Sequence, residues 1–139
     1  MTVVAGVDES PVSKLVAARA VEQARWRGTD LLLVHFTYAP MLYADVPIDW
    51  SDVVEAQRKL VWAPLQPIIE QADVAVETVD LDGYPPEALV DYTAEVNASL
   101  LVVGTRGRGD LASLILGSTS HRAIHSATCD VLVVKADGR

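Results

Sequence analysis

The chain has 139 residues, the length of one ordinary domain, and with 50% hydrophobic and 22% charged residues its composition is that of a globular protein. Its formal net charge of −8 repels the phosphate backbone of nucleic acids, so we expect no nucleic-acid partner. No apolar run reaches the roughly 18 residues that a helix needs to cross a bilayer, so we also expect no membrane span.

The first predicted unit is a strand, a loop and a helix. Met1 leads directly into TVVAGV (2–7) without a basic leader or an apolar secretory segment, so a cytoplasmic protein is expected. The β-branched run has little alternation, which is typical of a strand buried on both faces of a parallel sheet. Ser10 is then a predicted N-cap, Pro11 a first helical position and Gly28 a C-cap.

The second buried strand is predicted at LLLVHF (31–36), and His35 within it is interpreted as a core histidine with a hydrogen-bond partner. The segment 37–50 mixes prolines with aromatic residues and is predicted to be a loop or lid. The sequence leaves open whether this loop gates a ligand site.

A second helix is predicted to start near Asp52, because Asp52 followed by Glu55 resembles a capping box. The helix should run toward Gln71. Pro64 and Pro67 lie inside this stretch and should kink or interrupt it, because proline lacks the N–H that a helix interior needs.

The rest of the chain continues the alternation of strands and helices. Strands are predicted at VAVETV (74–79), SLLVVG (99–104) and DVLVVKA (130–136). A turn at Gly83 and two prolines should open a helix before the fourth strand, and a short helix is expected over 118–127.

This order predicts an α/β fold in which residues 1–139 form a single domain, with a doubly wound, five-stranded parallel sheet covered by helices on both faces. Ligands of such sheets bind beyond the carboxyl ends of the strands, where the strand order reverses. Asp8 follows the first strand, and Val103 and Gly104 end the fourth. We therefore expect these residues to flank the crevice.

A glycine-rich stretch, GTRGRGDLASLILGSTS (104–120), begins at this predicted crevice. Gly104 follows the strand directly, and Gly107 and Gly109 leave the backbone free for successive N–H groups to converge on an oxyanion. Gly117 opens the next helix, whose first N–H groups lack internal partners and favour negative charge. Three hydroxyl side chains add donors at this helix start: Ser118, Thr119 and Ser120. The stretch is a predicted phosphate site in two pieces, and it is not a Walker A loop because no GK[ST] follows.

Simpler interpretations of the same residues stay open. The glycines could only turn the chain, and the hydroxyls could only cap a helix. Arg106 could screen a triphosphate or be a solvated loop arginine. His121 and His125, four residues apart with Cys129 four further, have a spacing that could line up metal ligands, but the helix should end before the cysteine.

The glycine spacing, together with VDES (7–10), SLLVVGTRG (99–107) and VLVV (131–134), resembles the universal stress protein family over nearly the whole chain. The resemblance implies a flavodoxin-like, Rossmann-like sheet with strand order 3-2-1-4-5, and a site for ATP with Mg²⁺. It also implies roles for particular residues. Asp8 and Val34 would lie beside the nucleoside, and Pro11 and Val103 would line the same crevice. Contacts to ribose and phosphates would come from Gly104, Gly107, Gly117 and Ser118, with Thr119 and Ser120 as further donors.

No convincing catalytic set accompanies this site, so we expect an ATP-binding regulatory protein with at most slow hydrolysis. The final strand, 131–136, would be an apolar sheet edge, and the resemblance supports a homodimer that covers it. Two alternatives stay open: a Mg²⁺-dependent ATPase or nucleotidyl-transfer enzyme on the same fold, and an interaction domain that binds no nucleotide.

Overall fold

The computed structural model describes residues 1–37, 49–105 and 116–136. Its elements alternate along the chain: β1 (Thr2–Gly6), α1 (Val12–Arg27), β2 (Asp30–Thr37), α2 (Ser51–Trp62), the 3₁₀ turn η2 (Ala63–Leu65), α3 (Gln66–Gln71), β3 (Val76–Asp82), α4 (Pro85–Glu95), β4 (Leu100–Gly104), α5 (Ser118–Ser126) and β5 (Asp130–Val134). The five strands form one parallel sheet in the order β3-β2-β1-β4-β5. The predicted fold class and strand order are confirmed.

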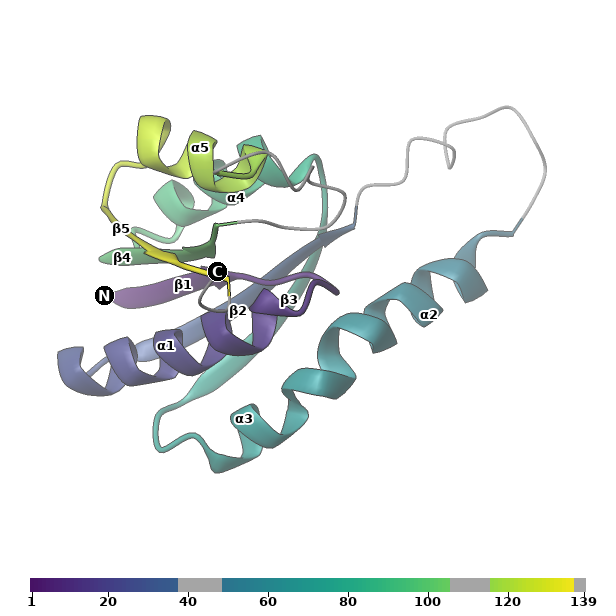
Figure 1. Cartoon of the computed structure of the whole chain (residues 1–139), viewed down its shortest axis with the longest axis horizontal. Helices are drawn as coiled ribbons and strands as arrows, with labels where there is room; N and C mark the ends of the chain where they lie inside the picture. The colour runs from purple at the N-terminus through teal and green to yellow at the C-terminus, as the bar shows by residue number, and fades with distance from the viewer. Residues whose placement is uncertain (38–48, 106–115, 137–139) are drawn as a thin grey trace.

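The sheet separates two hydrophobic clusters, as expected for strands that are buried on both faces. Figure 1 shows α4 and α5 on one face of the sheet and α1 and α3 on the other. Alternate residues of β1 supply the two clusters: Val3 and Ala5 pack on the side of α1, whereas Val4 packs on the side of α4 and α5. All three are fully buried. This packing fixes the strand ends that carry the polar residues described below.

Two glycines have the positive φ angles that their predicted turns require. Gly28 ends α1 at φ 63° and donates its N–H to carbonyls of the last turn, which confirms the predicted C-cap. Gly83 joins β3 to α4 at φ 154°, and a Cβ atom at this position would lie 2.9 Å from the Cβ of Ala88. The turn at Gly83 places the start of α4 at the carboxyl edge of the sheet.

The start of α2 differs from the prediction. The helix begins at Ser51 without a side-chain cap, so the capping box of Asp52 and Glu55 is wrong. Asp49 instead accepts hydrogen bonds from the N–H group (2.9 Å) and the hydroxyl (2.7 Å) of Ser51, and these bonds lower the pKa of the Asp49 carboxyl. The predicted interruption is confirmed, because Pro64 lies in the 3₁₀ turn that separates α2 from α3.

Other predicted bounds shift by a few residues. Ser10 is not the N-cap of α1, since Pro11 precedes the first helical residue and no side chain caps it. β3 runs to Asp82, three residues beyond its predicted end, because it stays paired with β2 as far as Thr37. β5 ends at Val134. Most of the predicted 37–50 loop, residues 38–48, lies outside the described residues. In the part of the chain that the structure describes, no helix is long and apolar enough to cross a membrane.

Candidate functional site

A crevice lies at the carboxyl edge of the sheet, where β1 and β4 end side by side. Six parts of the chain supply its walls. They are the end of β1 with the turn after it (6–10), the end of β2 (34–36), the starts of α1 and α4, Gly104 at the end of β4, and the start of α5 with Gly117, Thr119 and Ser120. β1 is flanked by β2 on one side and β4 on the other, so this is the point where the strand order reverses. It is the position in which parallel α/β sheets commonly hold ligands.

Thr105 ties the glycine side of the crevice together. Its N–H group donates to the carbonyl of Val134 (2.9 Å), and its own carbonyl accepts the N–H of Gly117 (2.6 Å) and the hydroxyl of Ser120 (3.2 Å). The hydroxyl of Ser120 also lies 3.0 Å from the carbonyl of Gly117. These bonds hold the start of α5 against the end of β4, so that Gly104 and Gly117 line one crevice although thirteen positions separate them in the sequence.

The N-terminus of α5 opens at this wall. The first helical hydrogen bond runs from the N–H of His121 to the carbonyl of Gly117 (2.9 Å). The N–H groups of residues 118–120 therefore belong to the first turn, which in any α-helix lacks intrahelical acceptors and carries the positive end of the helix dipole. Ser118 is exposed, Thr119 is half-buried in the crevice wall and Ser120 is buried. This end of the crevice suits an anion.

Another wall of the crevice is a tight turn built around Asp8. One oxygen of its carboxylate, Oδ1, accepts hydrogen bonds from the N–H of Ser10 (2.8 Å), from the hydroxyl of Ser13 (3.1 Å) and from the hydroxyl of Ser10. The N–H of Asp8 donates to the Ser13 hydroxyl (2.8 Å). Since Ser13 is buried in the first turn of α1, this network fixes the chain as it leaves β1 and shapes the crevice wall.

The end of β2 projects past the end of β1. The N–H of Val7 donates to the carbonyl of Val34 (2.9 Å), which is the last pairing between the two strands. Residues of a parallel strand alternate in the neighbour to which their backbone groups point, so the N–H and C=O of Phe36 face the side that β1 has vacated. Phe36 lines the crevice there. It was not among the predicted site residues, because an apolar residue at a strand end carries no sequence signal.

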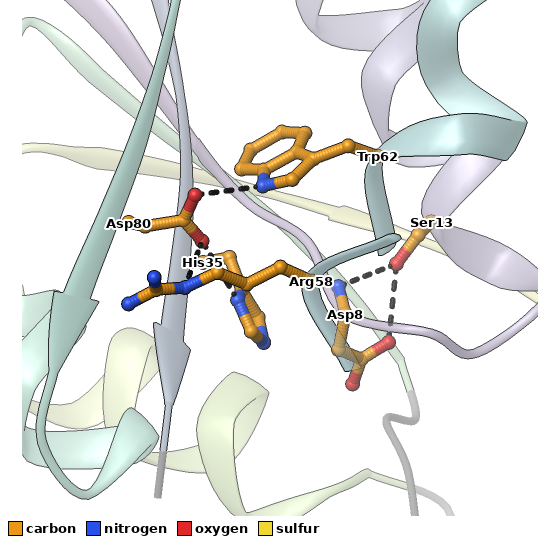
Figure 2. A network of polar contacts seen from close by, with 6 residues as sticks. All are labelled: Asp8, Ser13, His35, Arg58, Trp62 and Asp80. Carbon is orange, nitrogen blue, oxygen red and sulfur yellow. Dashed lines mark hydrogen bonds and ion pairs between the residues drawn. The ribbon is translucent and has the colours of Figure 1, made fainter. Parts of the chain in front are cut away.

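His35, predicted as a core histidine with a partner, is 2% exposed and is held by a polar cluster. Its Nδ1 lies 3.1 Å from Oδ1 of Asp80, the residue opposite it on β3. Two residues of α2 reach the same carboxylate: Trp62 donates its Nε1–H to Oδ2 (2.9 Å), and the Nε of Arg58 lies 3.8 Å from Oδ1. Figure 2 shows these side chains meeting at Asp80, with Asp8 and Ser13 nearby. His35 also lines the crevice.

The remaining predicted residues lie in different places. Val103 is buried in the hydrophobic cluster beneath α4 and α5, below the crevice rather than in its wall. Pro11 is exposed and lines a neighbouring hollow between the turn at Asp8 and the α2–η2 junction. Arg106 and Gly107 lie outside the described residues. The structure thus brings together Asp8, Val34, Gly104, Gly117, Thr119 and Ser120.

The spacing of His121, His125 and Cys129 does not produce a cluster of three. α5 ends at Ser126, as predicted, and the two histidine rings stack with their centroids 6.2 Å apart. No group of three potential metal-ligating side chains occurs among the described residues. Burial, and secondarily the neighbouring Asp130, raise the pKa of the Cys129 thiol, which is the opposite of what activates a cysteine nucleophile.

Comparison with known proteins decides the family. The model of the universal stress protein family matches residues 1–135. This chain belongs to the universal stress protein family. A curated universal stress protein of Mycobacterium tuberculosis is 35% identical over 96% of this chain. The match covers 45% of that relative, so the chain spans a little under half the length of the curated mycobacterial proteins that it matches.

Solved structures of universal stress proteins share the fold. One, described as a complex with cAMP, is 26% identical, with a TM-score of 0.70 and coverage of 97% of this chain and 96% of that one. Another, from Archaeoglobus fulgidus in complex with dAMP, is 25% identical, with a TM-score of 0.71 and coverage of 97% and 98%. Two structural neighbours of this chain are therefore complexes with adenine nucleotides.

Proposed function

We propose that this universal stress protein domain, residues 1–139, binds ATP with Mg²⁺ at the crevice between the ends of β1 and β4 and acts as a regulatory protein. One observation carries the proposal: the start of α5 and Gly104 line a single crevice together with the turn at Asp8 and the end of β2. A helix N-terminus that suits an anion and a strand end with apolar walls and backbone groups thus belong to one crevice, which is the combination that a nucleotide needs.

In this proposal the phosphates lie at the first turn of α5, near Thr119, and the base lies between Asp8 and the end of β2. Val34 would supply apolar contact to the base, and Phe36 would supply apolar contact and the backbone groups that face the side vacated by β1. Asp8 is the only carboxylate among the described residues that line the crevice, so Mg²⁺ would be held mainly by the phosphates and water. The cAMP and dAMP complexes of structural neighbours support an adenine nucleotide as the ligand.

We further propose that the nucleotide is held and not rapidly turned over. Phosphoryl transfer needs a group that positions the attacking water and groups that stabilise charge on the transferred phosphoryl. Both ionisable side chains of the described crevice wall already make hydrogen bonds within the fold: Asp8 Oδ1 accepts from Ser10 and Ser13, and His35 Nδ1 is hydrogen-bonded to Asp80. A partner protein would then recognise the nucleotide-bound form of this domain.

A melting curve and a turnover assay test this function together. At a Mg-ATP concentration about 100 times the Kd, binding should stabilise the native state by about 2.7 kcal/mol, which corresponds to a rise in Tm of roughly 5–12 °C. In the same sample, phosphate release should stay near the protein-free rate. Rapid multiple turnover would instead identify an ATPase, and an unchanged Tm would identify an interaction domain that binds no nucleotide.

We also propose that two copies pair through the predicted 131–136 strand, of which β5 extends to Val134. β5 lies at the edge of the sheet, with Val131, Leu132 and Val133 only partly buried. The carbonyl of Val134 faces β4 through its bond to Thr105, so by alternation the backbone groups of Val133 face the open edge. Such an apolar edge is a liability unless it is covered.

Replacing Val133 with proline should therefore shift the protein from dimer to monomer in sedimentation velocity, because proline removes an N–H from the open edge and keeps the pairing with β4. The folded monomer should retain Mg-ATP binding, since β5 contributes no side chain to the described crevice wall. A wild-type protein that sediments as a monomer at high micromolar concentration would contradict the proposed dimer.

A further inference from the structure

The polar cluster at Asp80 orients the ring of His35, a residue that lines the crevice. His35 and Asp80 are register partners on β2 and β3, and their side chains meet on the face of the sheet that α2 covers. Trp62 donates to the other oxygen of the same carboxylate, and its ring packs edge-on against the ring of His35, with the centroids 6.5 Å apart. The carboxylate and the imidazole are thus held in one relative orientation.

This contact determines which ring nitrogen carries the proton. An ionised carboxylate only accepts hydrogen bonds, so the bond to Asp80 places the proton of a neutral imidazole on Nδ1. Nε2 is then an acceptor. The Nε of Arg58 lies 3.8 Å from the same oxygen, so a guanidinium also flanks the carboxylate that binds Nδ1.

The acceptor faces the site. His35 lines the crevice together with Asp8, Val34 and Phe36. Figure 2 shows the second ring nitrogen of His35 directed away from Asp80, toward the end of the sheet at which the carboxylate of Asp8 also lies. The phosphate end proposed at Thr119 belongs to the wall formed by α5. Nε2 is directed toward the part of the crevice that this proposal leaves for the base.

We infer that His35 is a specificity residue of the nucleotide site: its Nε2 accepts a hydrogen bond from the exocyclic amino group of adenine, and Asp80 is the positioning residue that orients the ring with its Nδ1–H toward the carboxylate, so that Nε2 of the neutral imidazole is the acceptor. The inference rests on the proposed nucleotide binding. A 6-amino purine presents a donor to this nitrogen. A 6-oxo purine such as hypoxanthine presents a carbonyl oxygen, so two acceptors would face each other and neither would be satisfied.

The test compares Mg-ATP with Mg-ITP, two nucleotides that share ribose and phosphates and differ at the purine 6-position. Calorimetry measures the Kd of each nucleotide for the wild type, His35→Phe and Asp80→Asn. The preference for ATP is the Kd of Mg-ITP divided by the Kd of Mg-ATP. We expect the wild type to bind ATP about tenfold or more tightly than ITP. His35→Phe keeps an aromatic ring against Trp62 but has no hydrogen-bond acceptor. The preference of this variant for ATP over ITP should be at least about fivefold smaller than that of the wild type, mainly because it binds ATP more weakly.

Asp80→Asn is the second variant, and it tests the positioning role. An amide can donate to Nδ1 as well as accept from it, so both tautomers become populated and the preference for ATP should shrink although His35 is retained. If the variant only lost packing, it would bind both nucleotides more weakly by the same factor, and the ratio of the two dissociation constants would stay unchanged. Asp73→Asn is the control, because it neutralises an exposed aspartate that pairs with Arg25 (3.7 Å) outside the crevice, and it should keep the wild-type ratio.

The outcomes separate the two proposals. If the wild type binds ATP and ITP equally well, or if both folded variants keep the wild-type ratio, the role of His35 is overturned while nucleotide binding stands. If the wild type binds neither nucleotide, the proposed function fails and the inference fails with it. If His35→Phe does not fold, the ratio measured for Asp80→Asn decides.

Discussion

Replacing Gly117 with aspartate is expected to weaken Mg-ATP binding by about 100-fold or more, equivalent to about 2.7 kcal/mol, while the protein stays folded. Gly117 adopts φ −73° and ψ 169°, an extended conformation open to any residue, and it occupies the N-cap position of α5. Aspartate is a favourable N-cap, so its carboxylate should bind the N–H groups of the first turn. It would then hold the place proposed for the phosphates and repel them.

The matched control for this variant is Asn97→Asp, which adds the same negative charge. Asn97 is an exposed residue between α4 and β4, at the amino end of the strand whose carboxyl end reaches the crevice. Its φ angle is 54°, a conformation that aspartate tolerates. It should bind Mg-ATP like the wild type. Since Gly117 is buried, Thr119→Asp, at a half-buried position of the same wall, provides a second variant. Unchanged affinity in both folded variants would show that the phosphates do not lie at the start of α5.

Replacing Asp8 with alanine is expected to lower the free energy of unfolding by about 1–3 kcal/mol and to weaken ATP binding about tenfold or more. The substitution removes the acceptor of the Ser10 N–H and of the buried Ser13 hydroxyl, so donors of the turn after β1 lose their partner. The turn forms part of the crevice wall, so its loosening should disturb the proposed base site. Urea unfolding and calorimetry on the same samples measure the two effects.

Asp8→Asn separates the turn from the charge. Asparagine keeps an oxygen at Oδ1 that can accept the same hydrogen bonds, so most of the lost stability and affinity should return. If asparagine behaves like alanine in the binding assay while restoring stability, the negative charge of Asp8 acts on the ligand directly. If alanine leaves stability unchanged, the hydrogen-bond network at Ser10 and Ser13 does not support this wall.

The sheet was predictable because its signals are local. Each strand is a short apolar run, and the alternation of strands and helices limits the topology to a few arrangements. The capping box at Asp52 and Glu55 failed for a physical reason: Asp49, earlier in the chain, also offers a carboxylate, and it bonds Ser51 at the helix start. Asp49 and Asp52 are the same residue type, so the sequence pattern alone could not show which of them would bond the start of the helix.

The candidate site was only partly predictable. Asp8, Gly104 and Gly117 follow strands or open helices, positions that a sequence pattern can locate, and the structure brings them to one crevice. The partner of His35 could not be predicted, because Asp80 lies 45 residues away and only the register of β2 with β3 brings the two side chains together. Phe36 lines the crevice because β2 extends past the end of β1. Where β1 ends relative to β2 depends on the pairing of the two strands and could not be predicted from the residues around Phe36.

The central claim is that the crevice between β1 and β4 holds a nucleoside triphosphate, and a calorimetric titration of nucleotide-free protein with Mg-ATP, ADP and AMP tests it most directly. We predict one site per chain with a micromolar Kd for Mg-ATP, about −8 kcal/mol, and weaker binding as phosphates are removed, because the first turn of α5 would lose its anionic partner. No heat of binding with any of the three nucleotides, together with an unchanged Tm, would contradict the claim and leave the glycines at 104 and 117 as elements of the fold alone.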